Sequence, residues 1–162
     1  MESIRCKTGE FLMNEIFIPV LGIPAAQGSK KHVGRGILIE SSKKVAPWRQ
    51  DVRHAALEYY QDEPVSGAVK VTVEFIFARP KGHYGTGKNV GKLKPSAPMY
   101  ATSNNLGDLD KLLRSTFDGL AVRSGGTVLK DDSLIVEVEA KKRYVMAESE
   151  HVGANIKITK LP

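Results

Sequence analysis

The stretch Val69–Phe77 constrains the fold more than any other segment, because its side chains alternate strictly between apolar and polar. The apolar positions are Val69, Val71, Val73, Phe75 and Phe77. The positions between them begin with Lys70, Thr72 and Glu74. A period of two residues predicts a β-strand with one buried face and one solvated face. The chain must therefore contain something that covers one side of a sheet.

Two segments with helical spacing can provide that cover. Pro47 is well placed in the first turn of a helix, where its missing N–H costs nothing. The apolar stripe that follows it consists of Trp48, Val52, Ala55, Ala56 and Tyr59. A second stripe consists of Leu109, Leu112, Leu113, Thr116, Phe117 and Leu120. Both patterns predict amphipathic helices with a core-facing side.

Shorter apolar and β-branched runs predict the remaining strands. We expect them near residues 15–21, 36–40, 134–141 and 154–158. The order of elements favours an α/β (α+β) fold, with a single mixed β-sheet and two main helices packed on one face. A chain of 162 residues fits one domain, which we place at residues 15–162. Residues 1–14 show no sustained period and are interpreted as a flexible N-terminal leader.

Composition narrows the classes of function. The formal net charge of +6 favours a polyanionic partner such as a nucleic acid. Cys6 is the only cysteine, which excludes an intrachain disulfide and a cysteine-rich zinc site. No apolar run has the length of a membrane span, so no membrane association is expected. We expect a cytoplasmic protein of a bacterium or of a phage-infected host cell.

Two irregular segments are basic. Residues 27–36 form a glycine-rich turn, and residues 80–106 lack a usable period while containing several glycines and prolines. The longer segment is either an arm that orders on a phosphate backbone or a solvated loop without a role. Residues 82–89 nearly spell a phosphate-binding P-loop, but Asn89 replaces the Ser or Thr that would hold magnesium. No nucleotide cofactor is therefore expected.

Four aspartates bracket the second predicted helix: Asp108, Asp110, Asp131 and Asp132. Carboxylates gathered in one place raise one another's pKa, which is unfavourable unless a cation offsets the repulsion. Mg²⁺ prefers oxygen ligands and commonly takes one or two carboxylates with water and substrate phosphate. The pattern therefore suggests a divalent-metal site that acts on a phosphodiester.

The alternative for each acid is structural. Asp108 is a natural N-cap, and both Asp108 and Asp110 gain from the positive end of the helix dipole. The pair can converge only if Asp108 precedes the helix and Asp110 lies in its first turn. Asp132 would join them only if the turn after the helix allows it. Arg114 and Asp118 are interpreted either as rungs of an intrahelical ion-pair ladder or, for Arg114, as part of the site.

Two groups of motifs resemble the RusA-type Holliday-junction resolvases. Residues 107–114 read Gly-Asp-Leu-Asp-Lys-Leu-Leu-Arg, residues 117–120 Phe-Asp-Gly-Leu and residues 130–135 Lys-Asp-Asp-Ser-Leu-Ile. The front half of the chain is similar to the phage branch of that family. The similar stretches are Pro-Ala-Ala-Gln-Gly-Ser-Lys at residues 24–30, Glu-Ser-Ser-Lys-Lys at 40–44 and Pro-Trp-Arg at 47–49. The similarity spans nearly the whole chain from about residue 16.

The resemblance implies a homodimer that binds four-way DNA junctions and nicks opposing strands in recombination and repair. It implies dependence on Mg²⁺, with Mn²⁺ able to substitute. Asp108, Asp110 and Asp132 would be the metal-binding catalytic acids. Arg114 would join them at a position where the family's best-known member has lysine. Arginine stays protonated, so it would stabilise phosphoryl charge and would not shuttle a proton, a role that falls to Lys111 if it is needed.

A nuclease of this kind needs cations that contact the phosphate backbone. The expected DNA-binding residues are Lys30, Lys31, Arg35, Lys43, Lys44, Lys81, Lys88 and Lys111. Such contacts position the DNA and make binding strongly dependent on salt. Two alternatives stay open: a non-catalytic protein that binds branched DNA, and a less selective nuclease, including one directed at RNA.

Overall fold

The computed structural model describes residues 14–28, 30–40 and 42–162, so the predicted leader, apart from residue 14, lies outside the described residues. The helices and strands are β1 (Glu15–Leu21), β2 (Lys30–His32), β3 (Leu38–Glu40), α2 (Val45–Tyr59), β4 (Val69–Phe77), α3 (Leu109–Leu120), β5 (Ile135–Tyr144) and β6 (Gly153–Lys160). Two short 3-10 helices matter below, η3 (Asn104–Leu106) and η5 (Asp132–Leu134).

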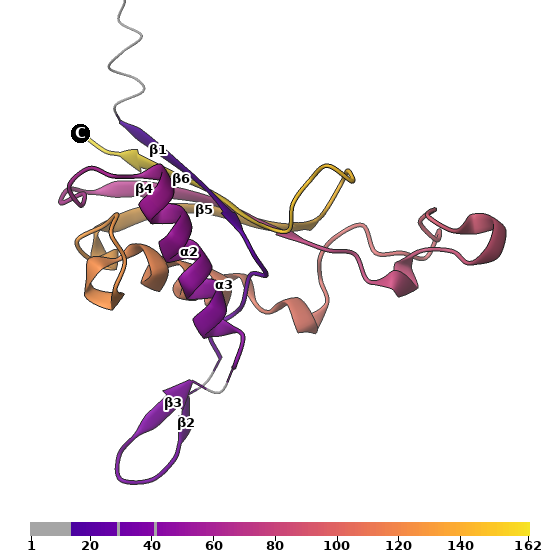
Figure 1. Cartoon of the computed structure of the whole chain (residues 1–162), viewed down its shortest axis with the longest axis horizontal. Helices are drawn as coiled ribbons and strands as arrows, with labels where there is room; N and C mark the ends of the chain where they lie inside the picture. Colours follow the sequence, from indigo (N-terminus) through magenta and orange to yellow (C-terminus); the bar gives the residue numbers. More distant parts are fainter. Residues whose placement is uncertain (1–13, 29, 41) are drawn as a thin grey trace, which may run out of the picture.

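Four strands form one mixed sheet in the order β1-β6-β4-β5. β4 runs parallel to β5, whereas β6 runs antiparallel to both β1 and β4. Helices α2 and α3 pack on each other and on one face of the sheet, with α2 against β1 and α3 against β5 (Figure 1). The predicted α+β class, with one mixed sheet and two main helices on one face, is confirmed.

The core lies between the helices and the sheet, as the alternation in β4 predicted. Every odd-numbered residue of β4 is buried, and Trp48 of α2 is fully enclosed. The expectation for Tyr59 was wrong, because its side chain is 52% exposed while Tyr60 is buried. The helix ends at Tyr59 and the backbone of Tyr60 is extended, so helical spacing no longer decides which ring turns inward.

The predicted alternation of β5 was wrong at its start. Leu134 belongs to η5, and the side chain of Val136 is 60% exposed. A register shift opposite Val69 and Lys70 places an extra residue in β5, so Ile135 pairs with Val69 and Glu137 with Lys70. The extra residue reverses the alternation locally, and Ile135 packs against the core.

The other face of the sheet carries charged pairs instead of a helix. Lys70 Nζ lies 2.6 Å from Glu139 Oε1, and Glu74 accepts from both Lys141 and Arg143 at 2.7 Å. Arg143 also donates to Glu150, which accepts in addition from the N–H of Met146 at 2.8 Å. The Arg143–Glu150 pair therefore fixes the loop between β5 and β6.

Replacing Glu150 by glutamine should destabilise the protein at neutral pH by about 1–2 kcal/mol, because a charge-assisted hydrogen bond is lost. Hydrogen bonds from Arg143 and then from Met146 lower the pKa of Glu150 to about 2. The folded pKa lies below the unfolded value, so this stabilisation is present above pH 4.5 and is lost as the pH falls towards 2. Urea unfolding at pH 7 and at pH 2 measures it. Glu148→Gln, an exposed position in the same loop, is the control; equal losses in both variants would contradict the assignment.

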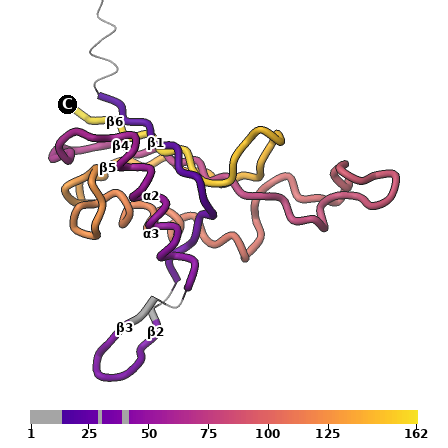
Figure 2. Tube along the Cα trace, in the orientation of Figure 1, coloured from indigo at the N-terminus to yellow at the C-terminus, as the bar shows by residue number. Residues whose placement is uncertain are grey.

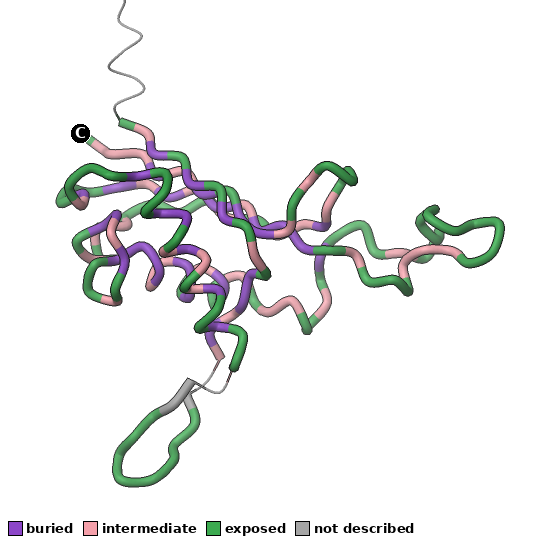
Figure 3. Tube along the Cα trace, viewed as in Figure 1, coloured by how far each residue is buried: buried purple, intermediate pink, exposed green. Residues whose placement is uncertain are grey.

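Two segments project from this body. The hairpin β2–β3 extends away from the helices, and residues 78–106 extend as an arm beyond the end of the sheet (Figures 1 and 2). Both are largely exposed along their length (Figure 3). The arm is attached at its root by Arg79, whose guanidinium lies 4.5 Å from the centre of the Tyr144 ring and donates to the carbonyl of Pro98 at 2.6 Å. We refer to residues 30–40 as the hairpin and to residues 78–106 as the arm.

Candidate active site

Asp108 and Asp110 lie at the start of α3, in the angle between the hairpin and the arm. Asp108 is the N-cap residue and Asp110 lies in the first turn, as predicted. The Asp108 carboxylate does not cap the helix; it accepts from Lys111 Nζ at 2.8 Å and is 66% exposed. This hydrogen bond and the charge of Lys111 lower the pKa of Asp108, so the carboxylate is ionised at neutral pH. Asp110 is exposed as well, so both carboxylates are accessible from solvent.

Contacts with two other segments, β5 and residues 25–26, hold α3 and the residue that precedes its N-cap. Lys142 Nζ of β5 donates to the carbonyl of Gly107 at 2.7 Å, and Ser115 Oγ donates to the carbonyl of Ala25 at 2.5 Å. Gly107 has a φ of +86°, and a Cβ there would lie 2.4 Å from the Cβ of Ala26. Sequence reasoning missed Lys142. Lys142 follows Val138 and Ala140 at a spacing of two residues, so the alternation of the strand places it on the same face as those residues.

Helix α3 is fixed laterally by α2. Trp48 Nε1 donates to Thr116 Oγ1 at 3.1 Å, and Arg49 pairs with Asp118 at 2.8 Å. The expected ion pair between Arg114 and Asp118 within α3 was wrong. Asp118 does have a structural role, but it pairs with Arg49 of α2. Its partner comes from the neighbouring helix because Gly119 permits close packing: a Cβ there would lie 2.7 Å from a methyl carbon of Val52. Arg114 is exposed and has no ion-pair partner among the described residues.

Asp132 lies at the opposite end of α3. The chain turns back after the helix, and the N–H groups of Val128 and Leu129 both donate to the carbonyl of Leu120 at 3.1 Å. β5 then runs from Ile135 beside this end towards Lys142 beside Gly107. Twelve helical residues span about 18 Å, so Asp132 and the Asp108–Asp110 pair are separated by roughly that length. Figure 1 shows the orange segment after α3 on the side away from the arm.

The residues of one chain therefore fit a metal ion only in part. Among residues 14–28, 30–40 and 42–162, no three acidic, histidine or cysteine side chains lie close enough together to hold one. Asp108 and Asp110 provide the hard oxygen ligands that Mg²⁺ prefers. Asp132 does not join them within the chain. Asp131 caps η5 by accepting from the N–H of Ser133 at 2.9 Å.

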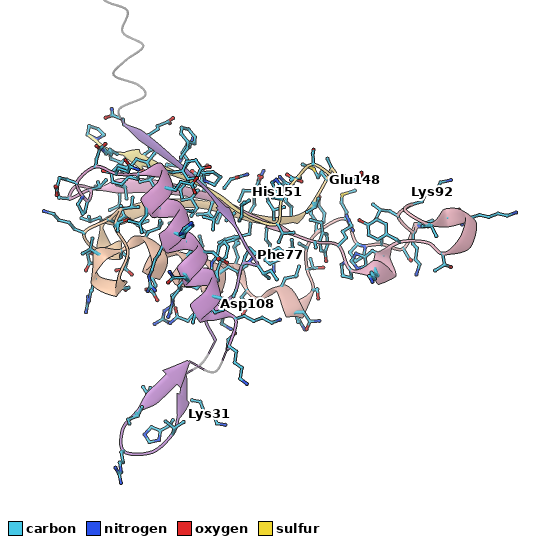
Figure 4. The ribbon with its side chains drawn as sticks, in the orientation of Figure 1. Lys31, Phe77, Lys92, Asp108, Glu148 and His151 are labelled. Carbon is cyan, nitrogen blue, oxygen red and sulfur yellow. The ribbon has the colours of Figure 1, made fainter. Side chains whose placement is uncertain are left out.

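Exposed cations lie along both projecting segments. Lys31 and Arg35 are exposed on the hairpin, Lys43 and Lys44 at its root, and Lys81 and Lys88 on the arm. Lys30 lies in β2, and its side chain is outside the described part of the chain. Figure 4 shows Lys31 and Lys92 extending in different directions, with Asp108 near the junction of the two segments. The acidic pair thus lies near the junction of two basic segments.

The comparison with protein families identifies the family of this chain. The family model described as endodeoxyribonuclease RusA matches residues 19–159. This range includes β1 from Pro19 onward, both helices and the aspartates at 108, 110, 131 and 132. The chain belongs to the RusA family. A search of curated protein sequences gave no match.

RusA proteins are endodeoxyribonucleases that act as Holliday-junction resolvases, so this chain is a DNA-cleaving enzyme of that type. Their substrate is branched DNA, and their activity generally depends on a divalent metal. Among the described helices, none is long and apolar enough to cross a membrane. Membership therefore assigns the class of reaction.

Proposed function

We propose that this RusA protein is a structure-specific endodeoxyribonuclease that resolves four-way junctions or other branched DNA by paired nicking, with Mg²⁺ as cofactor and Mn²⁺ able to replace it. It would act in recombination and repair. The observation that supports the proposal best is the exposed pair of Asp108, which Lys111 keeps ionised, and Asp110, between two basic projecting segments. Asp108 and Asp110 would hold a hard cation, which would supply charge stabilisation at the reacting phosphate.

The cations have two roles in this proposal. Lys30, Lys31, Arg35, Lys43, Lys44, Lys81 and Lys88 would contact backbone phosphates and position the branch point. Lys111 already contacts Asp108, so it would keep that carboxylate ionised and contact the adjacent phosphate when DNA is present. Arg114, one helical turn after Asp110, would stabilise phosphoryl charge from the exposed side of α3.

A homodimer would complete the site. If α3 packs against α3 of a second copy across a two-fold axis perpendicular to the helix, the two helices run antiparallel. The start of each helix then lies beside the end of the other, which is where Asp132 of the second copy would be. Because Asp132 lies roughly one helix length, about 18 Å, from Asp108 and Asp110 in the same chain, that rotation would place Asp132 of each copy near the pair of the other.

An apolar stripe at the edge of the molecule supports this packing. Leu109, Leu113 and Phe117 lie on the flank of α3 that faces away from α2 and are only partly buried. Val136 and Val138 are exposed on the adjacent edge strand β5. Exposed apolar surface of this kind is typical of the interface between two protein subunits.

Cleavage of a synthetic four-way junction during a titration with MgCl₂ tests the function. We expect no cleavage in EDTA, symmetric nicks in opposing strands at millimolar Mg²⁺ and recovery with MnCl₂. Linear duplex, flap and RNA substrates at equal concentration provide the comparison. Binding without cleavage at every metal concentration would favour the non-catalytic alternative, and equal cleavage of all substrates would favour the less selective nuclease.

A further inference from the structure

A depression lies beside Asp108, between the roots of the two projecting segments. Its volume is about 600 Å³, and its walls come from residues 23–26 and 42–44 at the hairpin root and from residues 104–107 at the end of the arm. Gly107 forms part of the wall, and Asp108 is the next residue. The depression therefore adjoins the proposed cleavage site, and its size is typical of pockets that take up small ligands.

The lining combines three kinds of chemical group. Ile23, which is 69% exposed, and Leu106 provide apolar surface. The amides of Asn104 and Asn105 are exposed on η3, and neither makes a side-chain hydrogen bond within the described part of the chain. Lys43 and Lys44 are exposed at the opposite wall and form no ion pair with any described residue. Apolar surface, free amides and free cations are thus collected in one place.

We propose that this depression, which we call the Asn104 pocket, receives one unstacked nucleotide of the branched DNA next to the phosphate that is cleaved. The side chains of Asn104 and Asn105 hydrogen-bond the edge of the base, Ile23 contacts its ring, and Lys43 and Lys44 contact the adjoining phosphate. The inference rests on the proposed function and deepens it, because it names the residues that determine the sequence preference of cleavage.

The chemistry of a nucleotide matches each wall of the pocket. An amide side chain offers a donor and an acceptor together, which is how asparagine distinguishes one base edge from another. A base inside a duplex presents only its groove edges, whereas a concave pocket takes in a whole ring that has left the stack. The branch point of a junction is where such bases are least costly to expose. Recognition of the base and cleavage beside it would therefore be coupled.

Cleavage rates on a set of four-way junctions test the inference. The junctions differ only in the nucleotides that flank the cleaved phosphate. We expect the wild-type enzyme to prefer one base by about 10-fold or more and the Asn104→Ala/Asn105→Ala variant to lose that preference. Asn155→Ala, an exposed asparagine on the uncovered face of the sheet, should keep it. Equal rates for all four bases with the wild-type enzyme, or an unchanged preference in the double variant, would overturn the inference.

A fluorescence measurement separates this inference from the proposed function. A junction carrying 2-aminopurine beside the expected cleavage position is bound to the protein in EDTA, where no cleavage occurs. Entry of the base into the Asn104 pocket should raise the fluorescence several-fold, and Ile23→Ala or the double asparagine variant should reduce that rise by at least half. A rise without any cleavage in Mg²⁺ would refute the proposed nuclease function and leave the pocket intact. Cleavage without a rise would refute the pocket.

Discussion

Replacing Asp108 and Asp110 together by asparagine should abolish junction cleavage while junction binding persists or becomes tighter. Asparagine has the size of aspartate but lacks the charge that holds a hard cation, so we expect cleavage to fall by about a thousand-fold or more. Both side chains are exposed, and therefore the fold should tolerate the change. Removing two negative charges beside a bound polyanion should also favour association.

The measurement compares cleavage in Mg²⁺ with junction binding in EDTA for the same preparation. Asp62→Asn/Glu63→Gln removes the same number of charges from an exposed turn before β4 and serves as the matched control. We expect that control to cleave normally. Nicking by the Asp108→Asn/Asp110→Asn variant at the wild-type rate would refute the assignment of the catalytic pair. A parallel loss of binding would mean that the acids support the DNA-binding surface instead.

Much of the fold was predictable because its sequence signals are local. The alternation in β4 requires one covered face, and two amphipathic stripes provide the cover. The errors occur where local spacing stops applying. Tyr60, not Tyr59, is buried because the backbone leaves the helix between them, and the phase of β5 shifts at a bulge that alternation alone does not reveal.

The candidate site was predictable only in part, because its geometry depends on contacts distant in the sequence. The positions of Asp108 and Asp110 follow from the start of a helix, a local feature. The interaction of Asp118 with Arg49 depends on the close packing of two helices. The support from Lys142 depends on β5 running beside Gly107. No sequence spacing indicated that Asp132 would lie at the far end of α3 in the same chain.

The placement of Asp132 leads to a second experiment with a large expected effect. Asp132→Asn alone and Asp108→Asn/Asp110→Asn alone should each be inactive. If the acids meet across a dimer, mixing the two variants should restore activity. In a mixed dimer, one site combines intact Asp108 and Asp110 from one subunit with intact Asp132 from the other, while the second site carries every substitution. Random exchange of subunits would recover about a quarter of the wild-type sites, since half of the dimers are mixed and each has one intact site.

The products distinguish this arrangement from one confined to a single chain. A mixed dimer with one intact site should nick one strand of the junction and should not produce the paired cuts that separate it into two duplexes. The mixture is prepared by unfolding and refolding the two variants together, and each variant refolded alone is the control. If the mixture stays as inactive as its components although mixed dimers form, Asp132 does not act across the interface. Because the fold holds Asp132 about one helix length from Asp108, that result would also remove Asp132 from the catalytic site.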